Sequence, residues 1–417
     1  MKIMSNDAKL IVLLFLFWVG ICTSPAVAQT EKRPLKIFIL AGQSNMQGHA
    51  KVSTFDYIGD DPETAPMLNE MRDSDGQPRM VKNTWISYLT HGRETPNGEG
   101  FGQLTAGYGA RTDPAEDGGK IGPEFTFGIF MQKSLNQPIL IIKTAWGGKS
   151  LHTDFRPPSA GPYQFNDSEL ESIKKRGLDL EQEQAKRKKQ TGVYYRLMIE
   201  HVKTVLQDIK RVCPDYHEDH GYEIAGFVWF QGWNDLVNSG VYPQRGQPGG
   251  YDKYSQWMGM FIRDVRKDLA TPDMPFVIGV IGVDGPIENV AQRYRAIHGS
   301  FRSAMAAPAA LPEFQGNVVA VKTAESWDMP LDQIQKRKGE LNAQKRTIQK
   351  RLKDGELTQS ESESELAKID AVLNGPEIKG KWDRGASNAA YHYYGCAKTM
   401  ALIGKSFAEA ILELQAE

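Results

Sequence analysis

Ser44 is the first residue of the sequence whose position suggests chemistry. It follows a short apolar run, residues 35–40, and stands between the polar residues Gln43 and Asn45. Such a run is typical of a buried strand in a parallel sheet. Open α/β sheets bind their ligands at the carboxyl ends of these strands. Ser44 is therefore a candidate nucleophile, although a serine after a strand is also a common helix N-cap.

Two other apolar runs also end in small polar residues. Residues 138–144 precede Gly147-Gly148, and residues 224–230 precede Gly232-Trp233-Asn234-Asp235. Because the carboxyl ends of parallel strands share one edge of a sheet, we expect these loops to meet Ser44 in one crevice. Glycine amides and an asparagine side chain are suitable donors for the oxyanion that forms in acyl transfer. These segments supply the parts of an ester-cleaving site, apart from a base.

His392 is the candidate base. It precedes the last predicted helix, whose apolar face carries Met400, Ile403, Phe407 and Ile411. A positioned imidazole is the commonest general base in proteins. A structural histidine is the alternative.

The strands that would position these groups are five apolar runs, at residues 35–40, 138–144, 224–230, 276–281 and 318–322. Helical patterns alternate with them, which predicts a parallel sheet with helices on both faces. Residues 50–120 are polar and rich in Gly, Asp and Pro, and are expected to form a long loop. Residues 168–190 are dominated by Glu, Lys, Arg and Gln and predict a solvated helix or lobe without a binding role.

A helical-hairpin insertion is predicted at about residues 329–375, where the alternation of strands and helices stops. The outgoing arm is basic and the returning arm begins acidic, so opposite charges would face each other. A partner-docking arm is the alternative.

The N-terminus predicts export. Lys2 and Lys9 precede an apolar run over residues 10–22, and Ala26-Val27-Ala28 follows. This is the pattern of a secretory signal over residues 1–28, and the run is short for a transmembrane span, with an uncleaved anchor as the alternative. Residues 29–417 are then one secreted or periplasmic domain. The charge is balanced, with 50 Lys+Arg against 51 Asp+Glu, which gives no support for nucleic acid as a partner.

Cysteine and histidine usage gives little support for a disulfide or a metal. Export would allow Cys213 and Cys396 to pair but does not require it. The histidines are scattered, without a CxxC or HExxH motif, so neither a metal nor a cofactor is expected.

Four blocks in order resemble the SGNH hydrolases, and within them the sialate O-acetylesterase-like carbohydrate acetylesterases. The blocks are Gly42-Gln43-Ser44-Asn45-Met46, Trp146-Gly147-Gly148-Lys149-Ser150, Gly232-Trp233-Asn234-Asp235 and His392-Tyr393-Tyr394-Gly395. The resemblance covers residues from about 34 to 415, apart from the loops and the hairpin. It implies a flavodoxin-like three-layer α/β/α sandwich around a five-stranded parallel sheet.

The resemblance also implies roles for individual residues. Ser44 would be the nucleophile and His392 its general base. The Ser44 backbone N–H, Gly148 and Asn234 would form the oxyanion hole. Gln43, Gln231 and Trp146, within or beside the same blocks, would contact substrate, with a structural amide as the alternative for Gln231.

The triad acid departs from the family pattern. The family usually has an acidic residue three positions before the histidine, where this sequence has Ala389, with Asn388 beside it. Asp328, after the fifth strand, is the preferred candidate. Glu325 and Asp383 are the others, and a Ser–His dyad without an acid is a further alternative.

The function we expect is a secreted serine esterase that removes O-acetyl groups from a glycan through an acyl-serine intermediate. A carbohydrate-binding protein on an inactivated esterase scaffold is the alternative from another class. A lipase or thioesterase would share the machinery but would need an apolar acyl channel, whereas the loops here are polar and aromatic.

Overall fold

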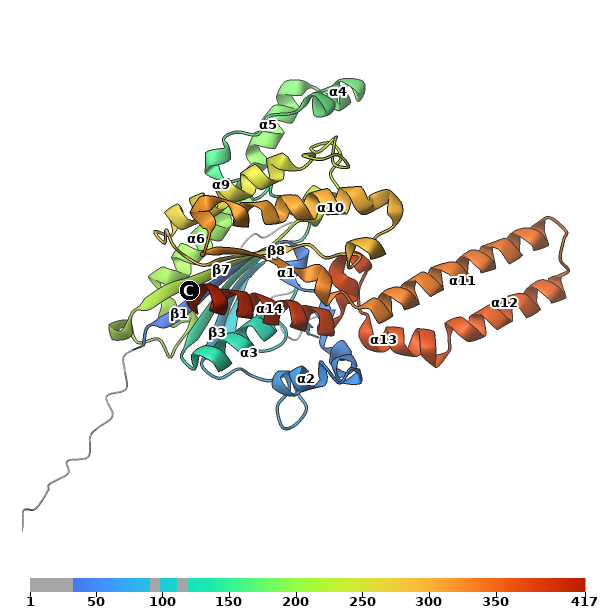
Figure 1. The fold of residues 1–417 in the computed structure, drawn as a ribbon, viewed down its shortest axis with the longest axis horizontal. Coiled ribbons are helices and arrows are strands. Elements are labelled where there is room, and N and C mark those ends of the chain that lie inside the picture. The colour runs from blue at the N-terminus through green and yellow to red at the C-terminus, as the bar shows by residue number, and fades with distance from the viewer. Residues whose placement is uncertain (1–32, 91–97, 111–118, 417) are drawn as a thin grey trace, which may run out of the picture. The chain divides into compact units, whose positions relative to one another are not determined.

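A seven-stranded sheet organises the chain (Figure 1). The protein is described from a computed structural model that covers residues 33–90, 98–110 and 119–416. The sheet order is β4 (Gly98–Gln103), β3 (Thr84–Thr90), β6 (Ile139–Ala145), β1 (Leu35–Gly42), β7 (Tyr222–Phe230), β8 (Phe276–Val280) and β9 (Val318–Lys322). Only β4 runs antiparallel, against β3, and all other pairings in this sheet are parallel.

The central strand is β1, which pairs with β6 on one side and β7 on the other. Its residues from Ile37 to Ala41 are completely buried. A strand covered on both faces favours apolar side chains, which explains its continuous apolar sequence. The carboxyl ends of β1, β6 and β7 therefore lie at one edge, as predicted.

The number of strands was predicted wrongly: the sheet has seven, not five. Both missing strands, β3 and β4, lie in residues 50–120, which were expected to be a loop. β3 has the sequence TWISYLT and β4 the sequence GEGFGQ, so neither contains a long apolar run. β4 is an antiparallel edge strand without buried residues, and such strands tolerate polar and glycine-rich sequence.

The same region also holds a 3₁₀ segment, η1 (Val52–Asp60), and a helix, α2 (Ala65–Met71). A small antiparallel pair is formed by β2 (Ala50–Lys51) and β5 (Lys120–Ile121).

Helices cover both faces of the sheet. On one face, Phe227 and Trp229 of β7 contact Phe261 of α9 (Asp252–Asp268). On the other, Phe230 contacts Phe407 of α14 (Ala397–Ala416), which packs against α3 (Glu124–Leu135) (Figure 1). Successive apolar side chains of β7 thus point to opposite faces of the sheet and pack against a helix on each face.

The remaining helices are mostly short or peripheral. They are α1 (Ser44–Gln47), α4 (Asp167–Lys175), α5 (Leu180–Gln190), α6 (Val193–Gln207), α7 (Ile209–Val212), α8 (Trp233–Leu236), α10 (Gln292–Ala306) and α13 (Lys381–Gly385). None of the helices in the described part of the chain has the length and apolar character needed to cross a membrane.

A helical hairpin stands where an insertion was predicted. It consists of α11 (Met329–Lys353) and α12 (Gln359–Leu373), which run side by side (Figure 1). Ion pairs Lys345–Asp370 (2.6 Å) and Arg351–Glu365 (3.5 Å) join the arms. The predicted secretory signal over residues 1–28 lies outside the described residues.

Candidate active site

Ser44 begins α1 at the carboxyl end of β1. As the first residue of that helix, its backbone N–H has no partner within the helix. The glycine loop after β6 lies close by, since a Cβ atom placed on Gly147 would be 3.9 Å from Cβ of Ser44. Ser44 is 7% exposed. Among the described residues its hydroxyl forms no hydrogen bond with His392, and such contacts are often long in unliganded enzymes.

The two neighbours of Ser44 tie it to the other predicted segments. Gln43 donates from Nε2 to Oδ1 of Asn234 (3.0 Å) and accepts from the backbone N–H of Gly232 (2.9 Å). Asn45 donates from Nδ2 to the backbone carbonyl of Tyr391 (3.2 Å), the residue before His392. Because Oδ1 of Asn234 is engaged by Gln43, the Nδ2 donor of Asn234 is left for a ligand.

His392 is a half-buried imidazole whose orientation is set by Asn388. Its Nδ1 lies 3.0 Å from Oδ1 of Asn388, which also accepts from the backbone N–H of Ala389 (2.8 Å). Since Oδ1 only accepts, Nδ1 carries the proton, and Nε2 holds the lone pair that a base needs. His49 stacks on the ring at 4.0 Å between centroids. Burial, with a smaller contribution from Lys120, lowers the pKa of His392 to about 4.

The geometry does not support any of the predicted acids. Asp328 caps α11 by accepting from the backbone N–H of Leu331 (2.9 Å), accepts from the Tyr57 hydroxyl (3.1 Å) and pairs with Lys398 (2.7 Å). Its carboxylate is therefore committed to holding the helical hairpin and α14 in place.

The other two carboxylates are also placed elsewhere. Glu325 is exposed and lines a separate hollow beside β8 and β9. Asp383 is exposed and paired with Lys379. Within the described residues no carboxylate contacts the His392 ring, and the side chain that contacts its Nδ1 is that of Asn388.

The predicted substrate contacts are buried, which corrects that expectation. Trp146 is 1% exposed and packs against Phe155 and Tyr194. Gln231 is 2% exposed and donates to Asp235 (2.7 Å), so it is a structural amide. Gln43, 1% exposed, positions Asn234. None of these side chains offers a surface to a sugar.

Asp235, the last residue of its sequence block, joins two of the loops. Its buried carboxylate accepts from the backbone N–H groups of Leu151 (2.8 Å) and His152 (3.3 Å) and from the Tyr242 hydroxyl (2.7 Å). The loop after β6 is thereby fixed to the loop after β7. Sequence reasoning quoted Asp235 with its block but gave it no role.

A buried ion pair contacts the last residue of α1. Lys143 of β6 donates to Glu124 (2.7 Å) and to the backbone carbonyls of Gln47 (2.9 Å) and Tyr108 (2.7 Å). Burial lowers the pKa of Lys143 and raises that of Glu124. Lys143 was predicted only as part of an apolar run.

A polar hollow of about 530 Å³ opens beside the predicted oxyanion donors. Gly148 and Asn234 line it, together with residues of the same two loops and of the α5–α6 junction: Lys149, Ser150, His152, Thr153, Asp154, Arg187, Lys189, Gln190, Val193, Tyr194 and Asn238. Hollows of this size accommodate small ligands. Residues 168–190, expected to have no binding role, therefore contribute Arg187, Lys189 and Gln190 to the lining of this hollow.

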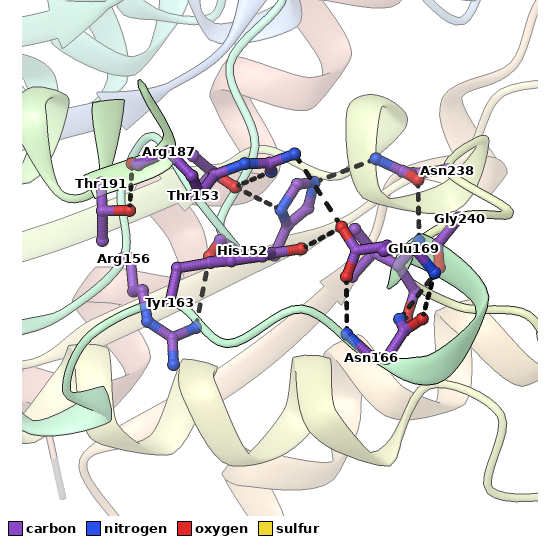
Figure 2. Close-up of polar contacts among 11 residues, drawn as sticks. His152, Thr153, Arg156, Tyr163, Asn166, Glu169, Arg187, Thr191, Asn238 and Gly240 are labelled. Atoms are coloured by element: carbon purple, nitrogen blue, oxygen red, sulfur yellow. Dashed lines mark hydrogen bonds and ion pairs between the residues drawn. The ribbon is translucent and has the colours of Figure 1, made fainter. Parts of the chain in front are cut away.

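The wall of this hollow is held by hydrogen bonds (Figure 2). His152 lies between Thr153 (2.7 Å) and Asn238 (3.2 Å), and burial lowers its pKa. Arg187 donates to Thr153 (2.9 Å) and stacks on the Tyr163 ring. The side chains around the hollow are thus pre-organised.

The two cysteines of the described region do not pair. Cys213 and Cys396 are both buried and free. Burial raises the pKa of each thiol to about 12, so neither behaves as a reactive thiolate.

A serine, an imidazole and amide donors on loops at the carboxyl edge of a mostly parallel sheet are the groups of a candidate esterase site in an α/β protein. A family model described as carbohydrate esterase, sialic acid-specific acetylesterase, matches residues 34–310. The chain belongs to this family, which confirms the predicted resemblance and supports the class of carbohydrate acetylesterase. His392 lies beyond the matched residues.

Two solved structures are similar to the chain. One is a protein of Arabidopsis thaliana, 18% identical, with 70% of this chain and 86% of that chain covered and a TM-score of 0.37. The other is a carbohydrate acetylesterase of Xanthomonas citri, 14% identical, with 69% and 49% covered and a TM-score of 0.35. The comparison with curated proteins finds no match.

Proposed function

We propose that this protein is a serine esterase that removes O-acetyl groups from a carbohydrate through an acyl-serine intermediate. One observation carries the proposal: the residues on either side of Ser44 are hydrogen-bonded to the Asn234 segment and to the His392 segment. Three loops distant in sequence are thus joined around one hydroxyl. Membership of a carbohydrate esterase family supports the same chemistry.

In the proposed first step, Oγ of Ser44 attacks the ester carbonyl while Nε2 of His392 takes the hydroxyl proton. The negative charge on the carbonyl oxygen is held by the backbone N–H groups of Ser44 and Gly148 and by Nδ2 of Asn234. Collapse of this intermediate expels the sugar hydroxyl, which takes its proton from His392, and leaves acetyl-Ser44.

In the second step, water attacks the acetyl-serine with His392 again as base, and acetate leaves. Asn388 orients the imidazole in both steps through its Oδ1. An amide in this role has a precedent in the Cys–His–Asn arrangement of papain-like proteases. It fixes the tautomer of the imidazole without adding a charge to stabilise the imidazolium.

Export belongs to the same proposal. We place the mature protein outside the cytoplasm, with cleavage after Ala28. N-terminal sequencing of protein recovered from the periplasm or medium tests this; a retained N-terminus and a cytoplasmic location would contradict it.

The esterase proposal is tested by measuring acetate released from O-acetylated glycans and from p-nitrophenyl acetate. We expect activity in the wild type and its loss in Ser44→Ala. Ser239→Ala, which changes an exposed serine, is the matched control and should keep wild-type activity. Glycan binding without acetate release by the wild type would instead indicate a carbohydrate-binding protein.

A further inference from the structure

Two aromatic rings stand beside the candidate catalytic groups. Tyr391 is 44% exposed, and its ring stacks on that of Trp233 with centroids 5.9 Å apart and an angle of 29° between the planes. Resting on the proposed function, we propose that this ring pair, Trp233 and Tyr391, is the platform on which a sugar ring of the acetylated glycan lies.

The position of the ring pair favours this role. Trp233 immediately precedes Asn234, the side-chain oxyanion donor, and Tyr391 immediately precedes His392. The Tyr391 ring also meets the imidazole of His392 edge to face, at 4.5 Å. A sugar lying on the pair would therefore bring an O-acetyl substituent next to both the base and the donor.

Tyr391 lies beside the candidate catalytic groups and no cation lies over its ring among the described residues, whereas Tyr222, equally exposed, is at the amino end of β7. Tyr194 lines the polar hollow, but Lys149 lies over its ring at 4.2 Å. Phe101 and Tyr294 are also exposed, yet Arg211 and Arg293 lie over their rings. Tyr391 has ring neighbours only in Trp233 and His392 among the described residues.

The chemistry of a pyranose fits such a pair. One face of the ring presents C–H bonds with small positive partial charges, which match the negative face of an aromatic ring. The polar hollow beside Gly148 and Asn234 can bind hydroxyl groups but has no uncovered ring of this kind. A sugar ring can therefore stack on the pair, whereas a simple alkyl acetate has no ring face to place there.

The test compares a sugar ester with an ester that has no ring. Kinetics are measured on glucose penta-acetate and on ethyl acetate for wild type, Trp233→Leu, Tyr391→Leu and Tyr391→Phe. Leucine keeps apolar bulk but removes the flat face, and every variant keeps the main-chain carbonyl that Asn45 uses. Tyr222→Leu, at the start of β7 and 43% exposed, is the matched control.

We expect the leucine variants to lose kcat/KM on glucose penta-acetate about three- to tenfold more than on ethyl acetate, mainly through KM. Tyr391→Phe should keep the wild-type ratio, and Tyr222→Leu should change neither ester. Leucine variants that lose kcat/KM equally on both esters, or that lose none, would overturn the platform while leaving the esterase proposal intact. Failure of the wild type to cleave either ester would instead contradict the proposed esterase function.

Discussion

Oδ1 of Asn388 lies 3.0 Å from Nδ1 of His392, where a triad would place a carboxylate. An amide oxygen accepts the Nδ1 proton as a carboxylate does, so it orients the ring and fixes its tautomer. It carries no charge, however, and so gives little stabilisation to the imidazolium that forms during the reaction. The proposed catalytic group is thus a Ser–His–Asn arrangement.

Replacing Asn388 should lower kcat. We expect Asn388→Ala to lose about tenfold or more, because the imidazole loses its hydrogen-bonded orientation. Asn388→Asp should keep or raise activity, since a carboxylate can accept the same proton and stabilise the imidazolium. Both are measured as kcat on p-nitrophenyl acetate with folding checked by circular dichroism. Wild-type kcat in a folded Asn388→Ala variant would show that Asn388 has no part in catalysis.

The pH dependence of kcat/KM should reflect the burial of His392. The base must be neutral, and burial lowers its pKa to about 4, against an ordinary value of about 6.5. Activity should therefore persist through pH 6 and 5 and fall as the pH drops through about 4, provided that the protein stays folded there. Asn388→Asp should move this acid limb to higher pH, because a nearby negative charge favours the protonated ring. An acid limb near pH 6.5 in the wild type would contradict the burial of the base.

Gln43 should act through Asn234. We expect Asn234→Ala to lower kcat about 10²- to 10³-fold, as loss of one oxyanion donor does elsewhere. Gln43→Ala should lower kcat by a smaller factor, because it frees the side chain that it holds at 3.0 Å. The double variant should be no worse than Asn234→Ala alone. Fully multiplicative losses would mean that Gln43 acts independently of Asn234.

Asp328 should matter for stability and not for chemistry. Asp328→Ala removes the cap of α11 and leaves Lys398 without this partner. We expect a loss of about 3–5 kcal/mol in the free energy of unfolding, as when one member of a buried ion pair is removed. The kcat of the folded fraction should stay near the wild-type value. A large fall in kcat at unchanged stability would restore Asp328 as the triad acid.

The five apolar runs and the residues at their ends could be predicted from sequence, most clearly where a strand is buried on both faces and tolerates few alternatives. The run Leu35–Leu40 is such a case, and it lies within β1. β3 and β4 were not predicted, because the edge strand GEGFGQ has no apolar signature and the interior strand TWISYLT mixes Thr and Ser with its apolar residues. The place of β3 in the sheet is set by its pairing with β6, which is distant in the chain, and that of β4 by its pairing with β3.

At the candidate site, the direction in which each side chain points was the feature that the sequence could not predict. Membership of a sequence block places Gln43 and Trp146 near the site but does not say that both point into the protein. Arg187 lies in a segment whose composition suggests only solvent exposure, yet tertiary packing brings it to the hollow. Asn388 was noticed only as the neighbour of a missing acid, because an amide is not the residue type expected there.

The most direct test of the central proposal is to trap the acyl-enzyme. The wild type is mixed with p-nitrophenyl acetate, quenched in acid during turnover and digested, and the acetyl group is located by mass spectrometry. We predict one acetyl group on Ser44 in the wild type, and neither acetylation nor turnover in Ser44→Ala. Turnover with acetyl on another residue, or undiminished turnover in Ser44→Ala, would contradict the assignment of Ser44 as the nucleophile.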